Sequence, residues 1–356
     1  MAGVAKMDRY GGELPQGSDV LADQPAELGH DVLAFSHGRA ALAWYLDAHA
    51  DVSWAVHCAY TCPTVPSFFA RRGLQLKAFD VGASVDEVVN LVADKKGEGL
   101  ILIPALFGRN PWLDVGQLSR RCGPHVHIVI DAAQTAFGHE DYVAPRKGAV
   151  LSCPRKACAL GSGAFLRLSA AASSTDLKAV QSLPAALGPS MDKRKARAYF
   201  KTGNPDDESK GLALAVQCEQ EWPDTPHRMD DEDLQLFMMI DGQAHRRRRR
   251  ANAERLWSRI SQSGIRALDD RAGVKGVPFN FPVLLPSSVD RSQLLASLRD
   301  QRVFATSLWP DCDIDPLCHK LAASYRDHLV ALPIDQRFDD ADIDEIASRF
   351  MSCLLN

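Results

Sequence analysis

The sequence predicts an α/β protein with an open, largely parallel sheet and helices on both of its faces. Between residues 30 and 170, short apolar runs alternate with amphipathic segments, the order typical of βαβ connections. One run, 100–107, is apolar without interruption, as expected of a strand buried on both faces. A chain of 356 residues also leaves room for a second, smaller unit.

The first part of the chain predicts elements that alternate in character. The expected helices are 39–48, 64–72, 84–95 and 114–122. The expected strands are 54–60, 74–81, 100–107, 126–130, 149–153 and 164–168. The helix at 84–95 opens with Ser84 and Glu87, which have the spacing of a capping box.

The second part of the chain breaks this alternation. Residues 184–233 combine proline, glycine and dense charge, and we expect an irregular excursion around helical pieces there. Beyond it the pattern predicts a long helix at 234–263, a strand at 279–285, and helices at 292–302 and 340–354. We therefore expect a large α/β domain over 1–233, best supported over 30–170, and a small C-terminal α+β domain over 234–356.

The composition and net charge of the chain exclude several classes of protein and of binding partner. With 46% hydrophobic and 24% charged residues the chain is an ordinary globular protein, which excludes disorder, collagen and coiled coil. A net charge of −4 provides no overall attraction to nucleic acid or membranes, and we expect the five arginines at 246–250 to form a solvated helix face. No segment approaches the roughly 20 apolar residues of a membrane span. Nine cysteines without a C-x-x-C pair favour a reducing, cytoplasmic setting, and the histidines form no metal motif.

Candidate site residues follow the predicted strands, because ligands of parallel sheets bind at the carboxyl ends of the strands. Asp131 closes one strand, where it either caps a following helix or serves a ligand. Lys156 follows another, as a surface lysine or as an imine-forming nucleophile. Residues 36–39, Ser-His-Gly-Arg, open a predicted helix, either with an ordinary serine cap or as a phosphate cradle.

Together these three features match the needs of pyridoxal phosphate. That cofactor requires a lysine for an imine, a carboxylate beside its pyridine nitrogen and an anchor for its phosphate. A dinucleotide site is disfavoured because no G-x-G-x-x-G motif follows an early strand.

The ordered motifs resemble those of the DegT/StrS-type pyridoxal-phosphate aminotransferases, which act mostly on nucleotide-linked keto sugars. The matching segments are 36–42, 59–65, 107–114, 129–134, 152–156, 249–252, 308–310 and 332–337. The resemblance covers about residues 30–350 and implies fold type I, with a homodimer that has active sites at its interface.

The resemblance also implies roles for individual residues. Lys156 carries the cofactor as a Schiff base and acts as the base, and Asp131 pairs with the pyridine nitrogen. Gln134 lies near the ring, and Cys62 stands where many members place a stacking aromatic residue. The phosphate ligands implied are Gly38, Arg39 and Ser152, although many members have Gly-Thr in place of Gly38-Arg39.

The expected activity is transfer of an amino group, with glutamate as donor, to a keto substrate such as a nucleotide-linked keto sugar or a biosynthetic intermediate. Two alternatives stay open. One is a lyase or dehydratase reaction with the same cofactor on a similar substrate. The other is a non-catalytic, ligand-binding relative of the fold.

Overall fold

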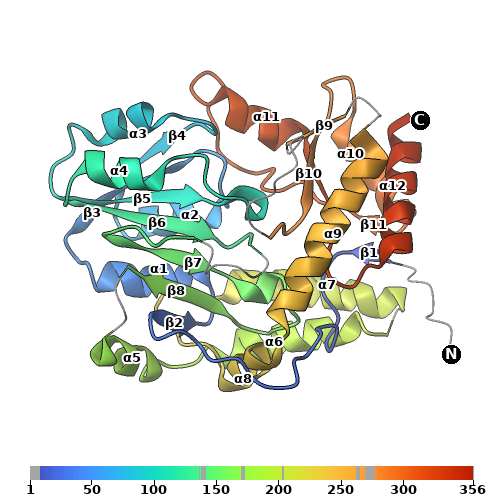
Figure 1. The fold of residues 1–356 in the computed structure, drawn as a ribbon, viewed down its shortest axis with the longest axis horizontal. Helices are drawn as coiled ribbons and strands as arrows, with labels where there is room; N and C mark the ends of the chain where they lie inside the picture. The colour runs from blue at the N-terminus through green and yellow to red at the C-terminus, as the bar shows by residue number, and fades with distance from the viewer. Residues whose placement is uncertain are drawn as a thin grey trace.

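A seven-stranded sheet forms the centre of the molecule in the computed structural model, which describes residues 9–135, 137, 142–169, 173–202, 204–261, 265–268 and 277–355 (Figure 1). Its strands, in spatial order, are β2 (Val32–Phe35), β8 (Ala164–Leu168), β7 (Gly148–Ser152), β6 (Val126–Ala132), β5 (Glu98–Pro104), β3 (Val52–Cys58) and β4 (Gln75–Phe79). Strand β8 runs antiparallel to both neighbours, and the other adjacent pairs are parallel. The largely parallel sheet is confirmed.

Helices cover both faces of this sheet (Figure 1). One face packs on α1 (Gly38–Asp47), α2 (Thr64–Arg71) and α5 (Ser174–Gln181). The other packs on α3 (Val85–Val92) and α4 (Val115–Cys122). Within β5, Leu100 and Leu102 belong to the first core and Ile101 and Ile103 to the second, so the strand is buried on both faces as its apolar run predicts.

The first part of the chain departs from the prediction in two places. The short strand β2 was not predicted, since its four residues precede the first helix without alternation. Strand β5 ends at Pro104 instead of Phe107, because Phe107 has a φ of 59° inside a 3₁₀ turn, Leu106–Gly108. The capping box of Ser84 and Glu87 is present.

The stretch 184–233 is more regular than the irregular excursion that its composition predicts. It contains α6 (Leu187–Tyr199) and α7 (Pro205–Glu221), which pack against one another, and the start of α8 (Asp231–Met239). The single helix predicted over 234–263 is wrong. The chain breaks after α8, and Asp241 caps a new helix, α9 (Gly242–Ile260), by accepting the amide N–H of Ala244. Residues 262–263 lie outside the described ranges.

The C-terminal part combines helices with small sheets. Strand β10 (Phe281–Leu284) pairs antiparallel with β12 (Leu329–Leu332) and β9 (Arg266–Ala267). The helices are α10 (Arg291–Asp300), α11 (Lys320–His328) and α12 (Asp340–Leu355). The N-terminal β1 (Tyr10–Gly11) pairs with β11 (Val303–Phe304), and Tyr10 packs in the C-terminal core. The division at residues 233 and 234 stays our proposal, with β1 crossing to the second unit.

The arginine run at 246–250 is not a solvated face. Arg249 is 1% exposed and donates to the Gln336 side chain at 2.8 Å and to the Phe279 carbonyl at 2.7 Å. Arg246 is also buried, and Arg248 pairs with Asp340. The prediction failed because one face of α9 packs against the rest of the molecule and buries Arg246 and Arg249, while Arg247 on the other face stays exposed. None of the helices in the described ranges is long and apolar enough to cross a membrane.

Candidate active site

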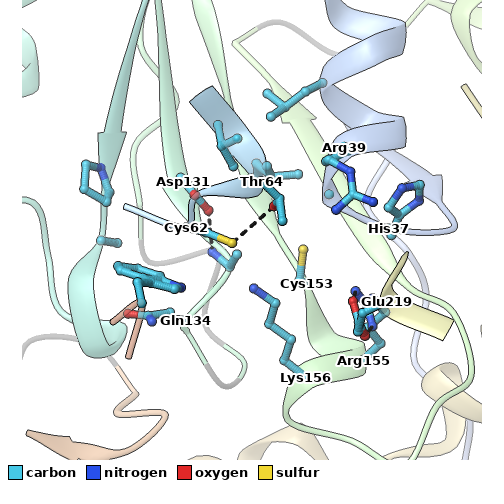
Figure 2. Close-up of a pocket in the computed structure, with 18 residues that line it drawn as sticks. His37, Arg39, Cys62, Thr64, Asp131, Gln134, Cys153, Arg155, Lys156 and Glu219 are labelled. Atoms are coloured by element: carbon cyan, nitrogen blue, oxygen red, sulfur yellow. Dashed lines mark hydrogen bonds and ion pairs between the residues drawn. The ribbon is translucent and has the colours of Figure 1, made fainter. Parts of the chain in front are cut away.

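A cavity of about 300 Å³ lies at the carboxyl ends of β5, β6 and β7, beside the first turn of α1 (Figure 2). Six of the seven residues predicted for the site line it: Gly38, Arg39, Cys62, Asp131, Gln134 and Lys156. The strands end together because they are parallel neighbours, and side chains far apart in sequence therefore meet. The size is that of a pocket for a small organic ligand.

Asp131 lies within β6 and faces the cavity. Because β6 continues to Ala132 and residues 133–135 are not helical, Asp131 is not the cap of a helix; its Oδ1 accepts the N–H of Ala133 at 2.9 Å. Burial raises the pKa of Asp131, while the positive charge of Lys156 opposes that shift. A partner in the cavity that carries a proton or positive charge would keep this carboxylate ionised.

Lys156 closes a short 3₁₀ turn, Pro154–Lys156, directly after β7. Figure 2 shows its side chain directed into the cavity. Within the described part of the chain, no hydrogen bond or ion pair engages its amine. The amine lies where a ligand of the cavity would meet it, which favours the imine-forming alternative over an ordinary surface lysine.

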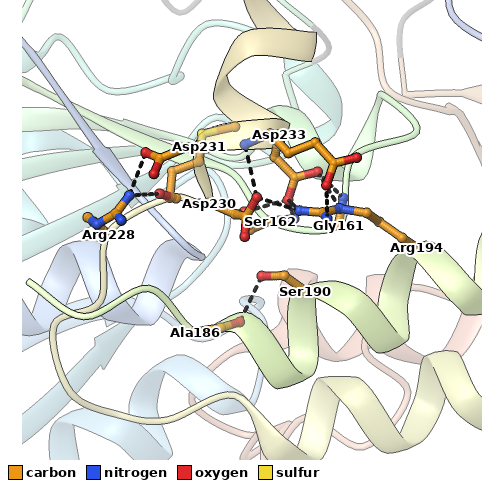
Figure 3. A network of polar contacts seen from close by, with 11 residues as sticks. Gly161, Ser162, Ala186, Ser190, Arg194, Arg228, Asp230, Asp231 and Asp233 are labelled. Carbon is orange, nitrogen blue, oxygen red and sulfur yellow. Dashed lines mark hydrogen bonds and ion pairs between the residues drawn. The ribbon is translucent and has the colours of Figure 1, made fainter.

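The glycine turn after Lys156 is fixed from a distant helix (Figure 3). Asp233, 1% exposed on α8, accepts the N–H groups of Gly161 at 2.9 Å and Ser162 at 2.7 Å, and the Ser162 hydroxyl at 2.7 Å. Arg194 of α6 neutralises Asp233 and Asp230. A side chain at Gly161 would meet the Ser190 carbonyl at 2.4 Å, so glycine is required where the turn meets α6. This network holds the loop that presents Lys156.

Gly38 and Arg39 begin α1 at the cavity wall. The first turn contains no acid, and its N-cap residue, His37, makes no capping bond. A Cβ at Gly38 would lie 3.1 Å from the Cys153 sulfur, so glycine allows α1 to pack closely against the residue that follows β7. The Arg39 guanidinium is engaged elsewhere, donating to Asp224 at 2.8 Å and to the Trp222 carbonyl at 3.3 Å.

The other three predicted residues lie around this centre. Ser152 is the one predicted residue that does not line the cavity; it is 3% exposed at the end of β7, and its hydroxyl has no hydrogen-bond partner among the described residues. The Gln134 side-chain oxygen accepts the N–H of Phe107 at 2.8 Å. The Cys62 sulfur lies 3.2 Å from the Thr64 hydroxyl.

Three residues of the cavity wall were not predicted from the sequence: Arg155, Glu219 and Trp309. Arg155 is 6% exposed and forms two hydrogen bonds with Glu219, at 2.7 and 3.0 Å. Burial opposes the charge of Arg155, but the Glu219 carboxylate outweighs it and raises the arginine pKa. His37 and Arg155 adjoin predicted residues in sequence, whereas nothing in the pattern around Glu219 connects α7 to this site.

His37 forms the upper part of this wall. Its ring stacks on Trp222 at 4.8 Å between centroids, and its Nδ1 lies 3.0 Å from the Ser36 hydroxyl. Burial, with the charges of Arg155 and Arg39, holds its pKa well below the usual value, so the ring is neutral. Its Nε2 is buried without a hydrogen-bond partner among the described residues.

Three potential metal ligands, Asp19, Cys158 and His245, lie within 4.8 Å of one another away from the cavity. Two are already committed: Asp19 accepts the N–H of Ala159 at 2.7 Å, and His245 Nε2 accepts that of Val20 at 3.0 Å. Burial and the charge of Arg249 lower the pKa of His245 to about 4. These contacts favour a junction that ties the N-terminal segment to the loop after Lys156, over a metal site.

Sequence comparison with protein-family models and with curated proteins finds no match. Solved structures do match. The Streptococcus pneumoniae protein Spr1654, assigned as a sugar aminotransferase and solved in its PMP form, has a TM-score of 0.62 at 14% identity over 94% of both chains. DesI, solved in the presence of its TDP-sugar product, has a TM-score of 0.63 at 13% identity over 97% of this chain and 94% of its own.

A third solved structure agrees. A DegT/DnrJ/EryC1/StrS aminotransferase from Brucella abortus has a TM-score of 0.60 at 15% identity over 91% of this chain and 86% of its own. The chain therefore has the fold of these aminotransferases, fold type I, as its motifs predict.

Proposed function

We propose that this protein is a pyridoxal-phosphate-dependent aminotransferase that moves an amino group, with glutamate as donor, to a keto compound such as a nucleotide-linked keto sugar. The observation that carries the proposal is the placement of Lys156 and Asp131 on one cavity beside the first turn of α1. The fold shared with known sugar aminotransferases supports it.

The residues of the cavity fit the cofactor. The Ser152 hydroxyl is buried without a partner among the described residues, and the first turn of α1, which lines the cavity and contains no acid, offers backbone N–H groups to an anion. We assign the phosphate to Gly38, Arg39 and Ser152, the pyridine nitrogen to Asp131, and the ring to the neighbourhood of Gln134 and Cys62. When bound, the cofactor supplies an electron sink and a carrier for the amino group.

The chain itself supplies attachment, charge and proton transfer. Lys156 Nζ holds the cofactor covalently and, once released, moves a proton between the substrate carbon and the carrier. The Asp131 carboxylate holds a proton on the ring nitrogen. Asp233 keeps the loop that follows Lys156 in place while the Lys156 amine alternates between holding the cofactor and moving the proton.

The experiment is a half-reaction in the absence of any keto acceptor. Protein loaded with pyridoxal phosphate is mixed with glutamate, and we expect its visible absorption band to bleach as 2-oxoglutarate and the pyridoxamine form appear in equal amounts. Other amino acids serve as parallel donors. If no amino acid converts the cofactor but the protein consumes a keto or sugar substrate, the lyase alternative replaces the proposal. If the protein takes up no cofactor, the non-catalytic alternative replaces it.

We also propose a cytoplasmic homodimer with active sites at its interface. All nine cysteines are free, as a reducing compartment requires. Large apolar side chains are exposed on the helix pair that contributes Glu219 to the cavity wall: Leu187 and Met191 on α6, and Leu212 and Val216 on α7. Apolar side chains of this kind beside a pocket are typical of a surface that a second subunit covers.

A further inference from the structure

The cavity wall beside Lys156 has more positive charge than its carboxylates neutralise. Its inner group contains three cations and two carboxylates: Arg155, Lys193, Arg197, Glu13 and Glu219. The next acid, Asp19, has Arg249 beside it. Arg39, which lines the cavity, shares the single carboxylate of Asp224 with Arg71, which lies outside it. Uncompensated cations in poorly solvated surroundings are costly, so the wall favours an anion in the cavity.

Arg155 is the cation of this group that lines the cavity. Arg197 is committed to the carbonyls of Cys158 and Arg155, and Lys193 lies 2.7 Å from Glu13. The Arg155 guanidinium packs 5.3 Å from the centre of the Trp222 ring, and its Nε is buried without a partner among the described residues. This aromatic support would keep the guanidinium in place whether or not Glu219 remains on it.

Glu219 is a partner of Arg155 that an anionic ligand can replace. Its side chain is 44% exposed at the end of α7, whereas Arg155 is buried. Lys193 already lies 3.5 Å from the same carboxylate oxygen, so Glu219 keeps a cation when it leaves Arg155. The first turn of α1, which has no acid, adds backbone N–H donors on the same wall, where the buried Nε2 of His37 also has no partner among the described residues.

We propose that Arg155 binds an oxyanion in this cavity and that Glu219 is the internal counter-ion which that anion displaces. The proposal rests on the proposed function for the source of the oxyanion, which is either the phosphate of the cofactor or the carboxylate of the amino donor. A bidentate guanidinium suits both groups equally. Glu219 then lowers the affinity for the anion, whereas Arg155 raises it.

The test measures anion binding to the cofactor-free protein by calorimetry at constant ionic strength, with inorganic phosphate and with glutarate as probes. Arg155→Gln should weaken binding at least about tenfold, the effect of losing a charge-assisted pair. Glu219→Gln should strengthen it by about threefold or more, because the competitor is gone. Glu221→Gln, which removes the same charge from an exposed site two residues away, should leave the affinity within about twofold.

The two variants are expected to change the anion affinity in opposite directions, which a purely structural ion pair between Arg155 and Glu219 would not do. If both Arg155→Gln and Glu219→Gln weaken binding, or neither changes it for either probe, the proposal is overturned. Shifts seen with phosphate alone assign the oxyanion to the cofactor, and shifts seen with glutarate alone assign it to the donor. Thermal melting identifies a variant that fails to fold. The double variant Arg155→Gln/Glu219→Gln removes both charges and should bind anions as weakly as Arg155→Gln.

Failure here is distinguishable from failure of the proposed function. Cofactor uptake by the wild-type protein is read separately from its visible absorption. Uptake without opposite shifts in the variants overturns the role of Arg155 alone. Opposite shifts without uptake retain the anion site and overturn the proposed cofactor.

Discussion

Asp131 is the residue whose chemistry depends most directly on the cofactor. Asp131→Asn should retain the cofactor but lose at least about tenfold in turnover, since a charge-assisted hydrogen bond contributes about 1.5–3 kcal/mol. The measurement is the rate of the half-reaction with glutamate, alongside cofactor content. Full turnover in this variant would mean that Asp131 has only a structural role, as the acceptor of the Ala133 N–H.

Arg39 offers a second test at single-residue scale, with a matched control. Arg39 and Arg71 both pair with Asp224, but of the two only Arg39 lines the cavity. Arg39→Ala should weaken retention of the cofactor in equilibrium dialysis by about tenfold, the value of a charged contact. Arg71→Ala should leave it nearly unchanged. Equal losses would mean that Arg39 acts only through the position of Asp224.

The site residues at the strand ends could be predicted because a parallel sheet brings the carboxyl ends of its strands together, independently of the conformation of the loops. Asp131 and Lys156 were found in this way. The pairing of Arg155 with Glu219 could not be, because it depends on how α7 returns to the sheet. Burial of a charged side chain by a distant helix leaves no periodic trace in sequence.

Among the elements, the glycine turn held by α8 makes a stability prediction. Asp233→Ala should lower the free energy of unfolding by about 3–5 kcal/mol, because Arg194 and two backbone N–H groups lose a buried partner. Asp231→Ala is the control: its carboxylate is 72% exposed and pairs with Arg228, so it should cost less than about 1 kcal/mol. Chemical denaturation measures both. Similar costs would contradict the anchoring role of Asp233.

The start of α9 makes a prediction about pH. His245 is fully buried, and its pKa is lowered to about 4 from an ordinary value of about 6.5. Between these values the unfolded chain binds a proton that the folded chain does not, so stability falls as pH falls from 6.5 to 4, by about 3 kcal/mol.

His37 and His127 also have lowered pKa values, so the informative quantity is a difference between two proteins. The free energy of unfolding of His245→Gln should depend on pH less steeply than that of wild type, by up to about one proton between pH 4.5 and 6. Identical slopes would show that His245 is accessible to protons in the folded state.

Elements were predictable where local signals agreed. The capping box at Ser84 and the uninterrupted apolar run of β5 marked their elements correctly. The break between α8 and α9 was missed although Asp241 and Gly242 mark a new start. The two-residue strands β9 and β11 are defined by their partners and carry no periodicity of their own.

At the scale of the whole molecule, the proposed homodimer predicts that the exposed apolar surface of α7 is covered. Leu212→Asp/Val216→Asp should raise the dissociation constant of the dimer roughly a hundredfold or more, as charges in an apolar interface do. Leu317→Asp, at an 85% exposed position, should not change it. Sedimentation velocity over a concentration series measures both. A wild-type monomer, or a dimer indifferent to the α7 changes, would contradict this surface.

The central claim is that Lys156 carries the cofactor, and borohydride reduction followed by peptide mapping tests it most directly. Lys147 is the natural competitor, because it lies at the other end of β7: Lys147 precedes this strand and Lys156 follows it. The Lys147 amine lies 3.0 Å from the carboxylate of Glu98, the first residue of β5. The account predicts a pyridoxyl group on Lys156, lost in Lys156→Arg and kept in Lys147→Arg. Label on Lys147, or on no lysine, would contradict it.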